Sequence, residues 1–208
     1  MIVVHHLDDS RSQRILWLLE ELAVPYEIKQ HRRDPKTRLA PPELKQIHPL
    51  GKSPVIEEGG HVIAESGAIV DYILRCYGNG RLQPAASSPA YDEYVHWMHY
   101  AEGSAMPALI VRINVARVGE AAAPALPRLD AEIALQLGYI DGRLEGRPYI
   151  LGSDLTAADI QLSFVGELAA ARFGISAYPN LAAWVKRFQA RPAYKTALAR
   201  GGAYSFAS

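Results

Sequence analysis

Ser10 is the first residue of the chain whose type and position suggest chemistry. It follows the β-rich run Ile2–Leu7 and precedes an apolar helical stripe that begins at Ile15. Its hydroxyl is therefore expected between a strand end and a helix N-terminus, where anions are stabilised. Ser10 and Gln13 also have the spacing of a capping box. The two interpretations are compatible, because a hydroxyl could accept a hydrogen bond from the helix backbone and still donate its proton to a bound thiolate.

A second candidate site is Glu65–Ser66, at the start of a helix expected to run to Tyr77. An acidic residue near the positive end of a helix dipole, followed by a serine cap, explains the pair structurally. The same helix N-terminus would also attract an anion, and the carboxylate would attract a cation. Between the two candidate sites we expect Lys52 in a solvated loop and Pro54 at the start of a strand.

Hydrophobic periodicity predicts a compact mixed sheet over residues 1–79. Its element order is strand, helix, strand, loop, strand, strand, helix, so a β-α-β unit is followed by a hairpin and a helix. The second strand is expected over residues 26–30 and the hairpin over residues 54–64. Gly78 is expected to end the last helix at its C′ position.

The second half of the chain has helical periodicity throughout. Residues 80–89 have the composition of a linker, and Ser88–Pro89 is expected to start the next helix. Residues 90–208 are expected to form an all-helical bundle, so the fold class is α/β followed by all-α. Its apolar stripes are Tyr94, Trp97, Met98 and Ala101; Leu129, Ile133, Leu137, Ile140 and Leu144; and Leu181, Trp184, Val185 and Phe188.

Composition excludes several classes of function. The chain has 208 residues, 22 Lys plus Arg against 22 Asp plus Glu, and a pI of about 7.1. This balance argues against a general binder of nucleic acid or anionic membrane. The basic cluster over residues 31–38 is expected to be a solvated loop, because no aromatic residues are interleaved for stacking on bases. No apolar run is long enough to span a membrane.

The metal-ligating and redox residues are few. His96 and His99 have helical spacing, but no third ligand is spaced to complete a metal site, so we expect none. Cys76 is the single cysteine and fits a reducing compartment. The N-terminus has neither a basic region nor a cleavage signal, so a cytoplasmic location is expected. Cys76 also lies at a helix end, which makes a cysteine-dependent reductase a weak alternative.

Several motifs carry a resemblance that spans nearly the whole chain in order and spacing. They are His-His-Leu-x-x-Ser10-x-Ser-x-Arg14-Ile-x-Trp-Leu-Leu-Glu-Glu-Leu, His48-Pro-Leu-Gly-Lys52-Ser-Pro54-Val-Ile, Glu65-Ser66-Gly-Ala-Ile, Leu155-Thr156-Ala-Ala-Asp159-Ile and Tyr178-Pro-Asn-Leu-Ala-Ala-Trp184. Together they resemble the cytosolic glutathione transferases, and most of all the theta-like bacterial and fungal members with a serine near the first helix. The resemblance implies a thioredoxin-like first domain that binds glutathione and a helical second domain that forms the electrophile pocket.

The resemblance also implies a role for each candidate residue. Ser10 would activate the thiol of glutathione, which is a co-substrate and not a permanently bound cofactor. Pro54 would be cis, so that the backbone of Ser53 pairs with the cysteinyl part of glutathione like an added strand. Glu65 and Ser66 would hold the ammonium and carboxylate of the γ-glutamyl group, and Lys52 would lie near the glycyl carboxylate.

In the helical half, the resemblance assigns the electrophile pocket to a stretch of aromatic and methionine residues, although such a stripe on a helix more often belongs to a core. It assigns Thr156 and Asp159 to a helix-capping box, and it implies a homodimer. The pocket residues are Tyr94, Met98, Tyr100, Ser104 and Met106.

The activity expected from these residues is conjugation of glutathione to electrophilic small molecules, with peroxide or disulfide reduction as further uses of the same site. The alternative is a non-catalytic glutathione-binding or protein-interaction module, because one fold hosts unrelated functions. Such a module would keep Pro54, Glu65 and Ser66 without needing Ser10 as a donor. Ser12 or backbone amides remain alternative activators of the thiol.

Overall fold

The computed structural model describes residues 1–207, which form two compact units. The first unit contains residues 1–83 together with residues 188–207, and the second contains residues 84–187. The first boundary between the units, after Gln83, falls inside the linker expected over residues 80–89. The helical domain was expected over residues 90–208, but residues 188–207 fold with the sheet. The chain therefore leaves the first unit and returns to it.

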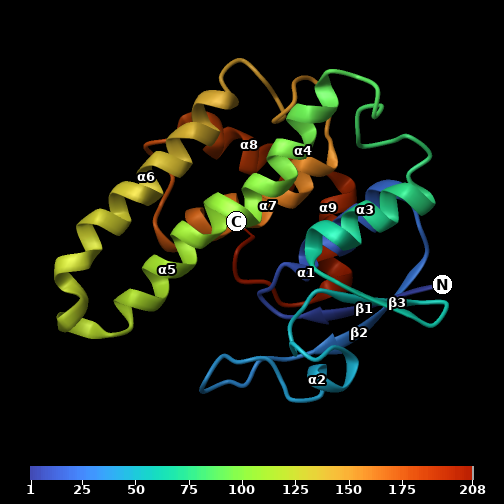
Figure 1. Cartoon of the computed structure of the whole chain (residues 1–208), viewed down its shortest axis with the longest axis horizontal. Helices are drawn as coiled ribbons and strands as arrows, with labels where there is room; N and C mark the ends of the chain where they lie inside the picture. Colours follow the sequence, from blue (N-terminus) through green and yellow to red (C-terminus); the bar gives the residue numbers. More distant parts are fainter. Residues whose placement is uncertain (208) are drawn as a thin grey trace. The chain divides into compact units, whose positions relative to one another are not determined.

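The first unit is built on a four-stranded sheet with β1 in its interior. The strand order is β2-β1-β3-β4, with β2 parallel to β1, and β3 and β4 antiparallel to their neighbours. Helices α1 and α3 lie on one side of the sheet and α2 on the other (Figure 1). This arrangement confirms the thioredoxin-like fold. The elements are β1 (Ile2–Leu7), α1 (Ser12–Leu22), β2 (Tyr26–His31), α2 (Leu44–Ile47), β3 (Val55–Glu58), β4 (His61–Ala64) and α3 (Ser66–Tyr77).

The predicted capping box at the start of α1 is wrong. Arg11 occupies the N-cap position, and no side chain caps the helix there. Ser10 instead ends a turn, in which its carbonyl accepts a hydrogen bond from the N–H of Gln13 at 3.2 Å and its hydroxyl accepts one from the N–H of Ser12 at 3.2 Å. The apolar stripe locates the helix but not its first turn, which begins later than the capping-box spacing requires.

The ends of α3 also differ from the expectation. Ser66 is the first helical residue and Glu65 occupies the N-cap position with a φ of 73°, a left-handed backbone that is uncommon for a residue with a side chain. At the other end Gly78 has a φ of −69°, so the helix ends without the left-handed turn expected of a C′ glycine. After the sharp turn at Glu65, Ser66 is buried at the N-terminus of α3.

Helix α9 (Pro192–Gly201) packs along α1 and completes the first unit. Trp17 of α1 stacks on Phe188 with ring centroids 5.3 Å apart and meets Tyr194 edge-on at 5.5 Å. Beside these rings, Arg191 donates two hydrogen bonds to the carboxylate of Glu21, at 2.6 and 2.9 Å. These buried aromatic contacts explain why residues 188–207 belong with the sheet.

The second unit is helical throughout its regular structure. Ile133, Leu137 and Ile140 are buried along α6, as the expected stripe requires. The capping box at Thr156 is confirmed, because the carboxylate of Asp159 accepts the backbone N–H of Thr156 at 2.9 Å. The elements are α4 (Ala90–Tyr100), a π-helical segment (Ala101–Ala105), α5 (Met106–Ala116), a 3-10 segment (Gly119–Ala125), α6 (Leu126–Arg143), α7 (Ala157–Arg172) and α8 (Pro179–Gln189), within which the unit boundary falls.

The docking of α9 predicts that Gly201→Ala destabilises the protein. A Cβ at this position would lie 2.9 Å from Leu16 Cδ1 and 3.1 Å from His6 Nε2. Overpacking of this kind costs about 1–3 kcal/mol, and urea unfolding would measure it. Gly138→Ala is the matched control, because a Cβ on this α6 glycine meets nothing within 4 Å. The control should gain up to about 1 kcal/mol from helix propensity. Equal free energies of unfolding for Gly201→Ala and Gly138→Ala would contradict the close packing of α9 at Gly201.

Candidate functional site

The register between β1 and β3 brings two turns together. Val55 pairs with His5, so the residues just before β3 lie beside the end of β1. Ser53 donates a hydrogen bond to the carbonyl of His5 at 2.9 Å, and its Oγ lies 3.5 Å from Oγ of Ser10. The Ser53–Pro54 peptide bond is cis, as the resemblance implies. Two of the predicted site residues, Ser10 and Ser53, are therefore neighbours.

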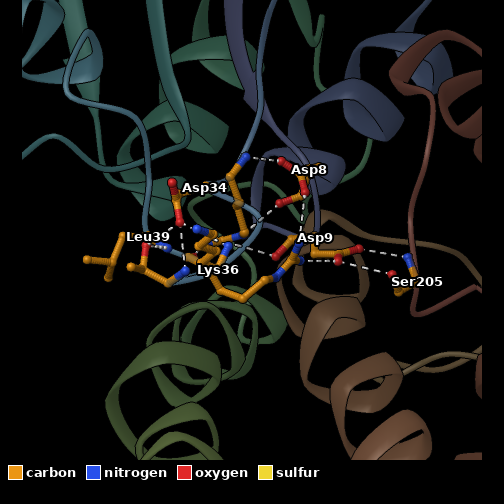
Figure 2. Close-up of polar contacts among 9 residues, drawn as sticks. Asp8, Asp9, Asp34, Lys36, Leu39 and Ser205 are labelled. Atoms are coloured by element: carbon orange, nitrogen blue, oxygen red, sulfur yellow. Dashed lines mark hydrogen bonds and ion pairs between the residues drawn. The ribbon is translucent and has the colours of Figure 1, made fainter.

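The turn that carries Ser10 is held by a network of charged groups around Asp8 and Asp9 (Figure 2). The backbone N–H of Arg33 donates to the carboxylate of Asp8 at 2.6 Å, and the Arg38 guanidinium donates to that of Asp9 at 2.7 Å. Ser205 donates from its N–H at 2.7 Å and from its hydroxyl at 3.0 Å to Asp9. The basic loop expected to be merely solvated thus partly supports the turn before Ser10.

Behind Ser10 lies a buried line of polar groups that leads inward to a histidine. Ser10 Oγ is 2.7 Å from Ser12 Oγ, which is 2.7 Å from Nδ1 of His6. Exposed fractions are 5% for Ser10, 0% for Ser12 and 1% for His6. Ser12 also accepts the N–H of Leu7 at 3.2 Å. The hydroxyl of Ser10 is therefore the outer end of a hydrogen-bonded chain.

His6 is a neutral imidazole near neutral pH. Burial lowers its pKa to about 4, against smaller upward effects of the Asp8 carboxylate and of a hydrogen bond with the Gly201 backbone. The nearby His31 lowers the His6 pKa further. Sequence reasoning gave His6 no role, although its position before the Ser10 turn on an interior strand was a usable signal.

Arg14 is a second residue that sequence reasoning left without a role. Its guanidinium is 1% exposed and donates a hydrogen bond to the hydroxyl of Ser66 at 3.2 Å. A buried cation thereby lies at the N-terminus of α3, where the helix dipole already favours an anion. The available signal was an arginine directly before the apolar stripe of α1, four residues after Ser10.

The two other residues predicted around this site are exposed. Lys52 lies in the turn before β3, and Glu65 precedes the first residue of α3. Both have their charged ends in solvent, where a pairing with a ligand is screened. The structure thus joins Ser10 to Ser53 and links Ser66 to α1 through Arg14, while Lys52 and Glu65 are exposed.

The five residues predicted for the electrophile pocket differ in exposure. Tyr94, Tyr100 and Met106 are buried and Met98 is half-buried, whereas Ser104 is exposed in the π-helical segment. The hydroxyl of Tyr100 donates to the side-chain oxygen of Gln136 at 2.5 Å, and burial raises the pKa of this phenol. Its ring packs against Trp97 with centroids 5.1 Å apart. These contacts give Tyr100 a structural function in the helical unit.

A pocket of about 560 Å³ does exist within the helical unit, but none of those five residues lines it. Aromatic rings of α4 and α6 form its wall, and glycines of α6 leave room for it. Arg143 and Glu93, which form an ion pair, are also among the residues that line it. The lining residues are Glu93, His96, Trp97, Gly138, Tyr139, Gly142 and Arg143.

Two further features of residues 1–207 concern metal binding and membrane spanning. No group of three or more His, Cys, Asp or Glu side chains in this part of the chain is arranged to hold a metal ion. Within the same residues, no helix combines the length and the apolar character that crossing a bilayer demands.

The burial of His6 predicts a pH dependence of stability. The pKa of His6 is lower in the folded state than in the unfolded chain, so the unfolded chain binds more protons between pH 6.5 and 4. The stability from neutral His6 is complete above about pH 6.5 and decreases as the pH falls toward 4, by about 3 kcal/mol in all.

The control is His6→Asn, which keeps a polar side chain but does not titrate. Urea unfolding of both proteins between pH 4 and 7 would measure the difference, in which the other titrating groups cancel. Parallel stability curves would contradict a buried neutral imidazole.

Comparison with known proteins assigns the family. Residues 1–75 match the N-terminal domain of glutathione S-transferases, and residues 69–192 match their C-terminal domain. Glutathione S-transferase 3 of Schizosaccharomyces pombe is 37% identical, covering 95% of this chain and 86% of that protein. A glutathione S-transferase structure from Actinobacillus pleuropneumoniae is 35% identical with a TM-score of 0.88, over 95% of this chain and 91% of the other. A glutathione transferase family member from Pseudomonas fluorescens, solved with two glutathione molecules, is 28% identical with a TM-score of 0.78, over 94% and 91%. The chain belongs to the glutathione S-transferase family.

Proposed function

We propose that this glutathione transferase binds glutathione in its first unit, with the thiol at Ser10, and conjugates it to electrophilic small molecules. The observation that carries the proposal is the position of the Ser10 hydroxyl. It lies just after the carboxyl end of β1, and its oxygen is 3.5 Å from the hydroxyl oxygen of Ser53. Ser53 in turn forms the cis peptide bond with Pro54 that precedes β3. The structure of the Pseudomonas fluorescens relative, which contains glutathione, supports this choice of ligand.

The backbone of Ser53 would pair with the cysteinyl part of glutathione. A peptide that runs alongside the start of β3 can form main-chain hydrogen bonds like an added strand. This pairing would place the cysteinyl sulfur near Ser10, because Ser10 and Ser53 are neighbours. Since the contact uses backbone groups, the serine side chain at position 53 matters little to it.

The N-terminus of α3 would hold the γ-glutamyl group. Its carboxylate would meet the Ser66 hydroxyl and N–H, with the buried Arg14 guanidinium beside them. The exposed Glu65 would pair with the ammonium of the same group. Lys52 would complement the glycyl carboxylate from the rim of the site.

The chemical requirement is to ionise the thiol at neutral pH. A free thiol has a pKa of about 8.5, so only about 3% is thiolate at pH 7. Lowering that pKa by about two units takes roughly 2.7 kcal/mol in favour of the anion. A hydrogen bond from a hydroxyl to a charged acceptor contributes about 1.5–3 kcal/mol, and a helix N-terminus contributes up to about 2 kcal/mol. Together these two terms reach the required size.

The helical unit would supply the electrophile contacts. Met98 and Ser104 are accessible, whereas Tyr94, Tyr100 and Met106 would act from the core behind them. We include a homodimer and a cytoplasmic location in the proposal, on the family resemblance. An activity panel with glutathione and aryl halides, epoxides, enals, hydroperoxides and mixed disulfides would identify the class of electrophile.

One prediction of the proposed function concerns the affinity for glutathione. Ser66→Ala should weaken binding by about 1–3 kcal/mol, because it removes a buried charge-assisted hydrogen bond. Glu65→Ala and Lys52→Ala should each weaken binding less, and more visibly at low salt, because both of these pairings are exposed. Calorimetric titration with glutathione would measure all three. Unchanged affinity in both Ser66→Ala and Glu65→Ala would remove the γ-glutamyl assignment.

Another prediction of the proposed function concerns the pKa of the thiol of bound glutathione. Ser10→Ala should raise the pKa of bound glutathione toward that of the free thiol and lower turnover, while affinity changes little. The ultraviolet absorbance of the thiolate, followed from pH 5 to 9, would report the pKa. If wild-type protein binds glutathione with an ordinary thiol pKa, the chain is a binding module and not a transferase of this mechanism. If the wild-type complex has a lowered thiol pKa and Ser10→Ala leaves that pKa unchanged, Ser12 or backbone amides activate the thiol.

A further inference from the structure

The turn before Ser10 has an unusual backbone. Asp9, the residue directly before Ser10, has a φ of 49°, in the left-handed region that residues with a side chain usually avoid. Aspartate enters this region more readily than most residues, but such a backbone persists where its surroundings hold it. The contacts that hold Asp9 therefore also determine where the hydroxyl of Ser10 lies.

Arg33 holds the backbone of this turn. Its guanidinium donates from Nε to the carbonyl of Asp8 at 2.9 Å and from Nη2 to the carbonyl of Asp9 at 3.1 Å. The second carbonyl belongs to the peptide bond that joins Asp9 to Ser10. The remaining nitrogen, Nη1, donates to the carbonyl of Arg38 at 3.0 Å, which anchors the guanidinium itself. Because the guanidinium is planar and rigid, it restrains both peptide groups before Ser10.

The side chain of Asp9 is held by two segments that are distant in sequence (Figure 2). Arg38 donates to its Oδ2 at 2.7 Å, while Ser205 donates its N–H to Oδ1 at 2.7 Å and its hydroxyl to Oδ2 at 3.0 Å. The Asp9 side chain is only 12% exposed, so these contacts are screened less than those of a surface pair. The backbone and the side chain of Asp9 are thus both fixed.

On its other side, Ser10 is tied to the start of α1. Its hydroxyl accepts the N–H of Ser12 and its carbonyl accepts the N–H of Gln13, each at 3.2 Å. Both distances are at the long end of the range for such hydrogen bonds. The contacts of the preceding turn include shorter ones, down to 2.6 Å between the Arg33 N–H and Asp8. The position of Ser10 therefore depends on the turn as well as on the helix.

We propose that Arg33 and Asp9 are positioning residues that hold the Ser10 hydroxyl where it donates to the thiolate of glutathione. The inference rests on the proposed function, in which Ser10 is that donor. A donor that is already in place stabilises a forming charge more than one that must first be ordered. Arg33 and Asp9 act through Ser10, and no covalent bond changes, because they only restrict the turn.

Arg33→Lys tests the hold on the backbone. Lysine keeps the positive charge near Ser10 but lacks the planar fork that binds two carbonyls at once. The thiol pKa of bound glutathione should rise by about 0.7 units, roughly a fivefold fall in the ratio of thiolate to thiol, which is the size of one ordinary hydrogen bond. Turnover below the thiol pKa should fall by the same factor. The affinity for glutathione at that pH should change less than about twofold, because its other contacts are kept.

Arg32→Lys is the matched control. Arg32 is the neighbouring arginine, and its side chain is exposed. This variant should keep the wild-type thiol pKa and turnover. An unchanged thiol pKa in Arg33→Lys overturns the proposal. An equal rise in Arg32→Lys also overturns it, because the effect would then not depend on the contacts with the turn.

Asp9→Asn and Asp9→Ala test the hold on the side chain. Both remove a negative charge close to Ser10, so electrostatics alone predicts the same lowered thiol pKa in both. Asparagine adopts the left-handed backbone readily and keeps an oxygen for the Ser205 N–H, whereas alanine avoids that backbone and lacks the oxygen. The thiol pKa should therefore be higher in Asp9→Ala than in Asp9→Asn, by about 0.7 units. Equal thiol pKa values overturn the proposal.

A double-mutant cycle separates action through Ser10 from a general disturbance of the site. The effect of Arg33→Lys on the thiol pKa must vanish in a Ser10→Ala background. Persistence of the shift there overturns the proposal. Ser10→Ala alone tests the proposed function. A shift in Ser10→Ala with none in Arg33→Lys overturns only the inference, whereas no shift in Ser10→Ala removes the donor of the proposed function as well.

The restraint itself can be measured without glutathione. The N–H groups of Ser12 and Gln13 donate to Ser10, so their hydrogen exchange reports how well Ser10 is held. By NMR, both should exchange about fivefold faster in Arg33→Lys than in Arg32→Lys. Equal exchange rates in the two variants overturn the proposal, whatever the transferase assays give.

Discussion

The pairing of β1 with β3 is the constraint on which the candidate site depends. With Val55 beside His5, the end of the interior strand and the turn before β3 must lie at the same edge of the sheet. This pairing makes Ser10 and Ser53 neighbours although they are 43 positions apart in the sequence. A slip of one residue in this pairing would oppose side chains from the wrong faces of the two strands and move Ser53 away from Ser10. Register therefore determines the chemistry of the site as much as residue type does.

Much of the fold could be predicted from the sequence, because strands and amphipathic helices have distinct periods. The stripe of α1 and the hairpin from β3 to β4 are examples, and so is the Thr156–Asp159 capping box, whose two partners are close in sequence. The cap at Ser10 could not be predicted in the same way. Whether a serine caps a helix depends on where the first turn begins, and that depends on the turn after β1.

The parts of the site that sequence reasoning missed all involve contacts between distant segments. Arg14 gains its role from Ser66 of α3, and the ring of His6 lies beside Gly201 of α9. The return of residues 188–207 to the first unit rests on Trp17 meeting Phe188 and Tyr194. A hydrophobic stripe shows that a face is buried but does not identify the element that covers it. Hydroxyl proton directions require every partner to be known.

The return of α9 to the first unit has a consequence for synthesis of the chain on the ribosome. Residues 1–83 emerge first, yet α9, the helix that covers α1, is translated only after residues 84–187. At about 5–20 residues per second, that interval lasts roughly 5–20 seconds. During this time Trp17 lacks the rings of Phe188 and Tyr194 that cover it in the finished protein. Chaperones that recognise apolar surface thus have a defined window and a defined target on this chain.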